Sequence, residues 1–166
     1  MADKTLDTLF HDTLKDIYYA ERKILKSLPK MVRAAQSPDL KAAFEKHIGQ
    51  TEGQIERLQQ VFEIIGKPAR GKTCEAIEGI LAEGDEIAEE YKGTAALDAG
   101  LLAAAQAVEH YEITRYGTLK RWALVLGLDN AAALLDETLQ EESQTDEDLT
   151  TLADATVNAE AMAAAA

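Results

Sequence analysis

The sequence predicts an all-α fold: a four-helix bundle with one long crossover that carries a short fifth helix. The composition favours helices, because only 5% of the 166 residues are aromatic and the chain has 10 Gly and 3 Pro residues. Apolar residues recur every three or four positions in four long segments, which is the period of an amphipathic helix. The connections between these segments are short, long and short, as in a bundle of two helical hairpins.

The first predicted hairpin covers residues 3–35 and 37–65. Pro29 is expected to kink the first helix or to end it early, because proline removes a backbone hydrogen bond. Ser37 and Pro38 are typical of the N-cap and first residue of the next helix. The predicted apolar stripe of that second helix consists of Leu40, Phe44, Ile48, Thr51, Ile55, Leu58, Phe62 and Ile65.

The second predicted hairpin follows a crossover of about 28 residues that contains a shorter amphipathic helix at 75–91. Thr94 is predicted to cap the third long helix. Gly127 is predicted to be the left-handed residue that follows the last turn of this helix. Asp129 is then expected to cap the fourth long helix.

One long crossover between two hairpins is the connection of ferritin-like bundles. A weak internal repeat supports this topology, because Gln-Thr-Glu at 50–52 is similar to Gln-Thr-Asp at 144–146. Glu21 likewise matches Glu112. Two similar hairpins packed face to face would bring these matched positions together around a pseudo-two-fold axis.

The charge of the chain opposes binding to nucleic acid. The net charge is −13, and residues 84–166 hold 4 basic and 17 acidic side chains, against 13 of each in residues 1–83. Residues 129–166 contain ten acids and neither Lys nor Arg. Such a surface repels a phosphate backbone, so no nucleic-acid partner is expected.

The length and the cysteine count predict a cytoplasmic protein with a single domain. We expect one ferritin-like bundle over residues 1–160 and an Ala-rich tail at 161–166 that frays. Cys74 is the only cysteine, which excludes a disulfide within the chain. The sequence has no secretory signal pattern and no apolar stretch near 18 residues, so neither export nor a membrane partner is expected.

Acidic residues occupy positions where the core of a helical bundle is normally apolar. Glu21, Glu109, Glu112 and Glu142 lie on the stripes, and Glu52 and Asp146 lie on their flanks. Each long helix contributes one of these acids near its middle. At a rise of about 1.5 Å per residue, antiparallel packing places them at similar heights. We therefore predict a single acidic layer across the bundle.

Several ionised carboxylates cannot share a dry interior without a counter-charge. Three sources are possible: arginines such as Arg22 and Arg115, which could pair with Glu52 or Glu112, protons shared between the acids, or metal ions. The acids outnumber the arginines, and hard divalent cations and iron prefer oxygen ligands. The leading hypothesis is a site for two iron ions, or manganese.

The general ligand pattern of di-iron bundles is only partly present. That pattern uses one Glu from each of two helices and a Glu-x-x-His from each of the other two, but the sequence contains no Glu-x-x-His. His47 is one turn from Thr51 and is either a ligand or a packed core residue. Asp146, one turn from Glu142, could also point inward. The predicted metal ligands are Glu21, His47, Glu52, Glu109, Glu112, Glu142 and Asp146.

Several motifs resemble a known family. They are Tyr-x-Ala-Glu-Arg-Lys-Ile-Leu at 18–25, Gly-Gln-Ile-Glu-Arg-Leu at 53–58, Gln-Ala-Val-Glu-His-Tyr-Glu-Ile at 106–113 and Thr-Leu-Gln-Glu-Glu at 138–142. Together they are similar to the YciF/YciE family of bacterial ferritin-like proteins, a domain of unknown function associated with stress. The resemblance covers residues 4–157.

The resemblance implies a rubrerythrin-like di-iron bundle that forms a homodimer. It carries one metal-binding acid onto Glu21 and a pair onto Glu109 and Glu112. Family members often have Glu where this chain has Gln50, so either Glu52 replaces that ligand or the site is asymmetric.

Two classes of function follow from these observations. In the first, two iron ions react with peroxide or O₂, which makes the protein a possible oxidoreductase that needs a separate electron donor. In the second, the protein is a non-catalytic structural or partner-binding stress protein whose acidic layer shares protons or pairs with Arg. Iron storage is a lesser third hypothesis, because it requires a closed shell of many subunits.

Overall fold

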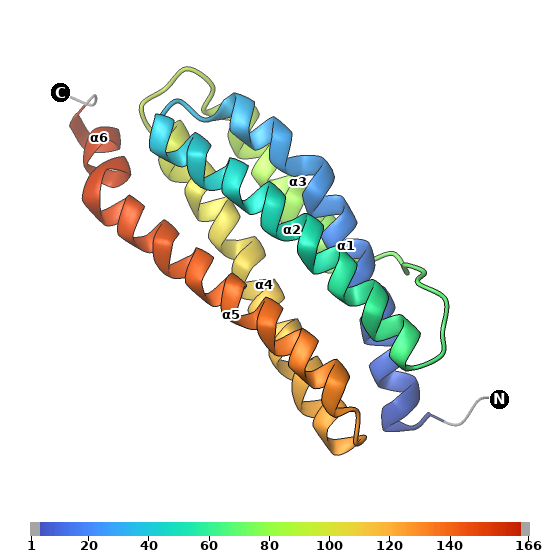
Figure 1. Ribbon diagram of the computed structural model, residues 1–166. Coiled ribbons are helices and arrows are strands. Elements are labelled where there is room, and N and C mark those ends of the chain that lie inside the picture. The colour runs from blue at the N-terminus through green and yellow to red at the C-terminus, as the bar shows by residue number, and fades with distance from the viewer. Residues whose placement is uncertain (1–3, 164–166) are drawn as a thin grey trace.

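The computed structural model describes residues 4–163 as a bundle of helices without a strand in that range (Figure 1). The five main helices are α1 (Leu6–Ala34), α2 (Pro38–Ile64), α3 (Glu75–Glu90), α4 (Leu97–Val125) and α5 (Asp129–Leu152). A π-helical turn, η1 (Ala153–Val157), joins α5 to α6 (Asn158–Ala163). Residues 161–163 of the predicted tail belong to α6, and residues 164–166 lie outside the described residues.

The α1–α2 hairpin packs against the α4–α5 hairpin, and α3 lies on the outside against α1 and α4 (Figure 1). This arrangement confirms the predicted fold class, including the long crossover and its extra helix. None of the described helices is long and apolar enough to span a membrane.

The ends of the first hairpin follow the local sequence. The Ser37 hydroxyl accepts a hydrogen bond from the Leu40 backbone N–H at 3.4 Å, and Pro38 begins α2, as predicted. The expected early end of α1 at Pro29 is not realised, because α1 continues to Ala34. Leu28 on one side of the proline and Ala35 on the other are both buried, so packing holds this last turn in the helix.

The predicted caps of the second hairpin need two corrections. Thr94 does not cap α4, because its hydroxyl donates to the Tyr91 carbonyl at 2.8 Å and Ala96 is the residue before the helix. Asp129 is the first residue of α5, where its charge favours the helix N-terminus, and Leu128 precedes it. Gly127 has φ +72° and ends α4 as predicted.

The buried face of α2 differs from the predicted apolar stripe. Ile48 and Ile55 are only half-buried, whereas the neighbouring polar residues His47 and Gln54 are buried. The residues that α2 buries are Leu40, Phe44, His47, Thr51, Gln54, Leu58, Val61 and Phe62. Up to Val61 their spacing alternates between four and three residues, which is the heptad pattern of a packed bundle. Hydrophobicity alone therefore misplaced the inner face by one residue in the middle of α2.

Two apolar clusters fill the ends of the bundle and enclose a polar layer between them. One cluster includes Phe10, Leu14 and Leu135, and the other includes Leu40 and Leu101. The crossover helix adds little to this core, since Ile77 is the only residue of α3 that is buried. The four long helices α1, α2, α4 and α5 therefore position the polar layer.

Asp98 at the start of α4 ties the two hairpins together. Its carboxylate is buried and accepts backbone hydrogen bonds from Gln36 at 2.8 Å and from Ser37 at 2.6 Å. These donors belong to the turn between α1 and α2. Hydrogen bonds to a buried charged group are stronger than those between neutral groups.

We expect Asp98→Ala to lower the free energy of unfolding by about 2–3 kcal/mol, because two backbone N–H groups lose a charged acceptor. Urea unfolding followed by circular dichroism measures this change. Asp39→Ala is the matched control, since Asp39 is an exposed acid in the first turn of α2, and it should cost less than about 1 kcal/mol. Equal effects of the two substitutions would contradict the role of Asp98.

Candidate metal centre

Five ionisable side chains from four helices meet in the polar layer. They are Glu21 on α1, His47 on α2, Glu109 and Glu112 on α4, and Glu142 on α5. The carboxylates are at most 1% exposed, and His47 is 4% exposed. Such burial of four acids is unusual, because a charged group loses its hydration when it enters the core.

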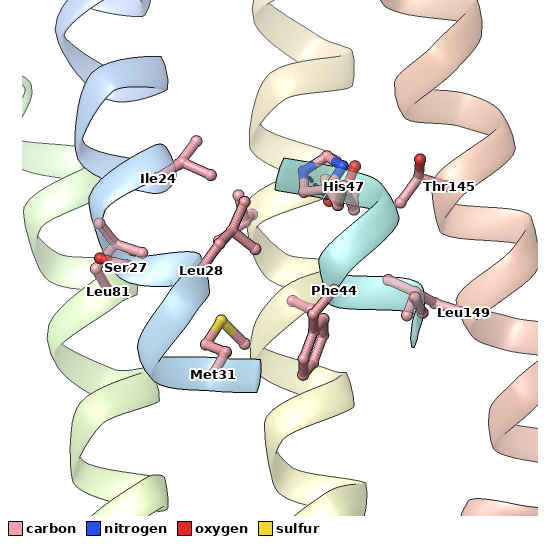
Figure 2. A pocket seen from close by; sticks show the side chains of 13 residues that line it. Ile24, Ser27, Leu28, Met31, Phe44, His47, Leu81, Thr145 and Leu149 are labelled. Carbon is pink, nitrogen blue, oxygen red and sulfur yellow. Dashed lines mark ion pairs between the residues drawn. The ribbon is translucent and has the colours of Figure 1, made fainter. Parts of the chain in front are cut away.

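Four of the five side chains converge closely enough to share one metal ion. His47, Glu109, Glu112 and Glu142 each offer a ligand atom, and these atoms all lie within 4.8 Å of one another. The Nε2 atom of His47 lies 3.1 Å from Oε1 of Glu109. Figure 2 shows His47 on α2 beside Thr145 of α5.

Glu21 extends the cluster on the side of α1. Its Oε1 atom accepts a hydrogen bond from the hydroxyl of Tyr116, which is fully buried on α4. The carboxyl groups of Glu21 and Glu112 are within hydrogen-bonding reach of each other, as are those of Glu109 and Glu142. The positions that match in the internal repeat, 21 and 112, are thus in contact.

Most of the inward-facing atoms of the cluster have no hydrogen-bond partner among residues 4–163. Nine buried side-chain N and O atoms are unpartnered, and eight of them belong to the four acids, His47 and Gln54. Both oxygens of Glu112 and both ring nitrogens of His47 are in this set, because the 3.1 Å approach of His47 Nε2 to Glu109 is an ion-pair distance without hydrogen-bond geometry. Buried polar groups are normally hydrogen-bonded, so this concentration indicates that something else satisfies them.

Arginine does not supply the counter-charge. Arg22 is exposed, with its guanidinium 5.7 Å from the centre of the Tyr18 ring, and Arg115 lies 5.2 Å from the centre of the Tyr111 ring. In the part of the chain that the structure describes, no Lys or Arg pairs with the buried acids. This overturns the Arg-paired version of the structural hypothesis.

Burial shifts the acids toward their protonated forms. It is the largest cause that raises the pKa of Glu21 to about 8, and the charge of Glu142 adds to it. Burial also raises the pKa values of Glu109 and Glu112 well above the ordinary range, with contributions from the neighbouring acids. Without a cation, the cluster therefore keeps protons at neutral pH.

The cluster fits divalent metal ions in both charge and ligand type. Glu21, Glu109, Glu112 and Glu142 carry four negative charges when ionised, which two divalent ions would balance. Carboxylate oxygens suit hard ions, and an imidazole nitrogen suits iron and other transition metals. The unpartnered oxygens provide the lone pairs that coordination requires.

The structure brings together five of the seven predicted ligands. Glu52 is a correction, because it is exposed and takes no part in the cluster. Asp146 is a second correction: it is half-buried, and its Oδ2 atom lies 3.0 Å from Nε2 of the exposed His110. The one-residue rotation of the α2 stripe explains the first error, because it turns position 52 to solvent.

Gln54 and Tyr116 are buried parts of the site that the ligand prediction omitted. The amide of Gln54 donates to Glu142, and also to Glu141 at 3.1 Å. A heptad spacing from Leu40 would have placed Gln54 inward, and Tyr116 is one turn beyond Glu112 on the predicted α4 stripe. Both side chains donate to acids of the layer and fix their orientation.

The fold and the site together define a ferritin-like four-helix bundle with a buried cluster of carboxylates and one imidazole. A comparison with known protein families identifies one family within this class. Residues 5–162 match the family described as a domain of unknown function, DUF892, and the chain belongs to this family.

Named relatives resemble the chain over nearly its whole length. Protein YciF of Escherichia coli (strain K12) is 44% identical over 159 residues, which cover 95% of this chain and 96% of YciF. The crystal structure of the E. coli stress protein YciF superposes with a TM-score of 0.89 and covers 94% of this chain and 99% of that one. YcfI from Rhodopseudomonas palustris is 46% identical, with a TM-score of 0.87 over 89% of this chain and 94% of that one. The chain thus resembles YciF and YcfI over nearly its whole length.

We expect the metal-free protein to lose stability as the pH rises from about 4.5 to about 8. In this window the unfolded chain has released the proton of Glu21, whose ordinary pKa is 4.5, while the folded chain retains it up to a pKa of about 8. The folded state then binds more protons, so raising the pH favours unfolding. Urea unfolding in the presence of chelator across this range measures the slope.

Glu21→Gln should reduce this slope, because the amide does not titrate. Glu52→Gln should leave it unchanged, since position 52 is exposed. A pH-independent free energy of unfolding for the wild-type chain would show that the buried acids are not protonated in the folded state.

Proposed function

We propose that this protein binds two divalent metal ions, iron in the first instance and manganese as the alternative, in the centre of its helical bundle. The observation that carries the proposal is the group of four buried carboxylates and one buried histidine. Together with Gln54, these side chains have eight buried atoms without a hydrogen-bond partner. No arginine or lysine among residues 4–163 offsets their charge. Metal ions satisfy the charge and the unpartnered atoms at once.

The ligands divide between the two ions according to their positions in the layer. His47 and Glu109 would bind the first ion, on the side of the cavity drawn in Figure 2. Glu21 would bind the second ion, with its free oxygen Oε2 available because Oε1 accepts from Tyr116. Glu112 and Glu142 would complete the ligand set, because both are fully buried in the layer and have unpartnered carboxylate oxygens.

When bound, iron would supply one-electron redox chemistry toward O₂ or peroxide, as metal cofactors do in proteins. The chain itself would do three things. The acids and His47 hold the charge, Tyr116 and Gln54 orient Glu21 and Glu142 through hydrogen bonds, and the apolar clusters at both ends exclude water. This would make the protein a redox-active member of a stress-protein family.

Protein prepared with chelator and then given ferrous iron without oxygen should retain about two ions per chain after desalting, as the charge balance requires. Glu112→Gln removes one negative charge and one carboxylate ligand from the layer, so it should retain fewer than one. Elemental analysis by mass spectrometry measures the content, and manganese is tested in the same way.

Glu52→Gln is the matched control for this experiment. It makes the same chemical change on α2 at an exposed position, so it should bind as much metal as the wild-type chain. Wild-type protein that retains well under one ion of either metal would overturn the proposal.

A structural role is the second candidate function, and two observations favour it. YcfI from Rhodopseudomonas palustris is described as a candidate structural protein. The carboxyl pairs Glu109–Glu142 and Glu21–Glu112 could also be held by shared protons instead of metal. In that case the bundle would act without a bound ion, as a scaffold or as a partner for other proteins.

The two candidates predict different effects of Glu112→Leu on stability. Without metal, replacing this buried acid with an apolar side chain should raise the free energy of unfolding, by up to about 1–4 kcal/mol. Free ferrous iron at a thousand times its dissociation constant should stabilise the wild-type chain by about 4 kcal/mol, and the mutant by much less. Urea unfolding with chelator and with anaerobic ferrous iron measures both changes. Absence of an iron effect on either protein would support the structural role, and equal effects on both would place Glu112 outside the site.

A further inference from the structure

A small apolar cavity lies directly against the histidine side of the acidic layer. Helices α1, α2, α4 and α5 enclose it, with α3 at one side (Figure 2). Its walls include the apolar side chains of Ile24, Leu28, Phe44, Val108 and Leu149. His47 and Glu109 form part of the wall as well, so the cavity borders two of the residues proposed to bind metal.

The cavity has room for a very small molecule. About 20 Å³ is open to the centres of water-sized molecules, and a space of roughly 10–15 Å³ on this measure is enough for one water. A water molecule is stable in a protein only with two or more polar partners, and the surface that faces this cavity is almost entirely apolar. The hydroxyl of Thr145, another wall residue, is already bonded to Gln50 at 3.3 Å.

A second cavity adjoins the first. It also has about 20 Å³ on the same measure and lies between α1, α3 and α4. The two cavities share the side chains of Ser27, Met31, Leu81 and Val108, and three of these four are labelled on the α1 and α3 side of Figure 2. Met31 lines both cavities, and methionine is the most adaptable apolar side chain.

An exposed ion pair forms part of the wall of the second cavity. Lys30 and Asp85 line this cavity and approach to 2.8 Å, with their side chains 55% and 60% exposed. Exposed ion pairs contribute little stability, so this pair separates easily. The two cavities therefore lie along one line of small apolar spaces between solvent and the acidic layer.

We propose that the two cavities form a binding passage for dioxygen that ends at His47 and Glu109. The occupant is a small apolar gas because the surface that faces the cavities is almost entirely apolar and the spaces are of molecular size, with His47 and Glu109 in the wall where the first cavity meets the acidic layer. The role of the passage rests on the proposed function, because the passage would deliver O₂ and not peroxide to the metal centre. The binding of gas itself is a property of the metal-free protein and can be tested without metal.

The test uses dissolved O₂ as a paramagnetic probe in nuclear magnetic resonance. Metal-free protein with labelled methyl groups is compared under O₂ and under N₂ at equal pressure. The relaxation rates of the methyl groups of Ile24, Val108 and Leu149 should rise several-fold more than those of Leu119 and Leu135. The last two are equally buried leucines that do not line either cavity. Equal enhancement at all buried methyl groups, or magnetisation transfer from water to the cavity methyls, would overturn the proposal.

Ser27→Leu should fill the junction between the cavities and remove most of the enhancement at Ile24 and Val108. Ser143→Leu is the matched control, because Ser143 is a half-buried serine on α5 that lines neither cavity, and it should preserve the enhancement. If Ser27→Leu fails to fold, Met31→Phe tests the same junction. Loss of metal binding with intact gas binding would reject the proposed function alone, and the reverse result would reject the passage alone.

Discussion

The burial of like charges in the middle of the bundle is the constraint on which the rest of the structure depends. Four carboxyl groups in a buried layer have lost their hydration and repel one another when ionised, so the layer by itself opposes folding. The apolar clusters at the two ends provide the compensating hydrophobic stabilisation. A sequence selected only for stability would place leucine at these positions, so the acids indicate a function that requires them.

The ligands come from all four long helices, and this distribution couples the site to the complete fold. Neither hairpin alone contains the cluster, because α1 and α2 contribute Glu21 and His47 while α4 and α5 contribute the other three acids. A bound cation would therefore stabilise the assembled bundle and not an isolated hairpin. The same reasoning explains why Gln54 and Tyr116 matter: each makes a hydrogen bond from one hairpin to the other within the layer.

Much of the fold could be predicted from the sequence, because long amphipathic helices give a strong periodic signal. Glu21, Glu109, Glu112 and Glu142 were identified for the same reason, since they interrupt clear apolar stripes. The inner face of α2 was harder to assign. The inward residues His47 and Gln54 are polar, so hydrophobicity favoured the adjacent isoleucines. One residue of error turns a helix by about 100°.

Contacts between distant segments could not be predicted from local patterns. The exposure of Glu52 depends on that rotation of α2, and the position of Asp146 depends on its contact with His110. The capping error at Thr94 has a similar origin. A threonine can bond backward or forward along the chain, and here it bonds back to Tyr91.

The crossover helix α3 is attached to the bundle by very few buried side chains, with Ile77 the only fully buried residue within it. The free energy needed to open a segment locally follows the buried contacts that the segment makes. Of the five main helices, α3 is therefore the one whose detachment needs the least free energy while the rest of the protein stays folded. Because α3 also forms the outer wall of the second cavity, such partial unfolding would open the interior without separating the four helices that carry the acids.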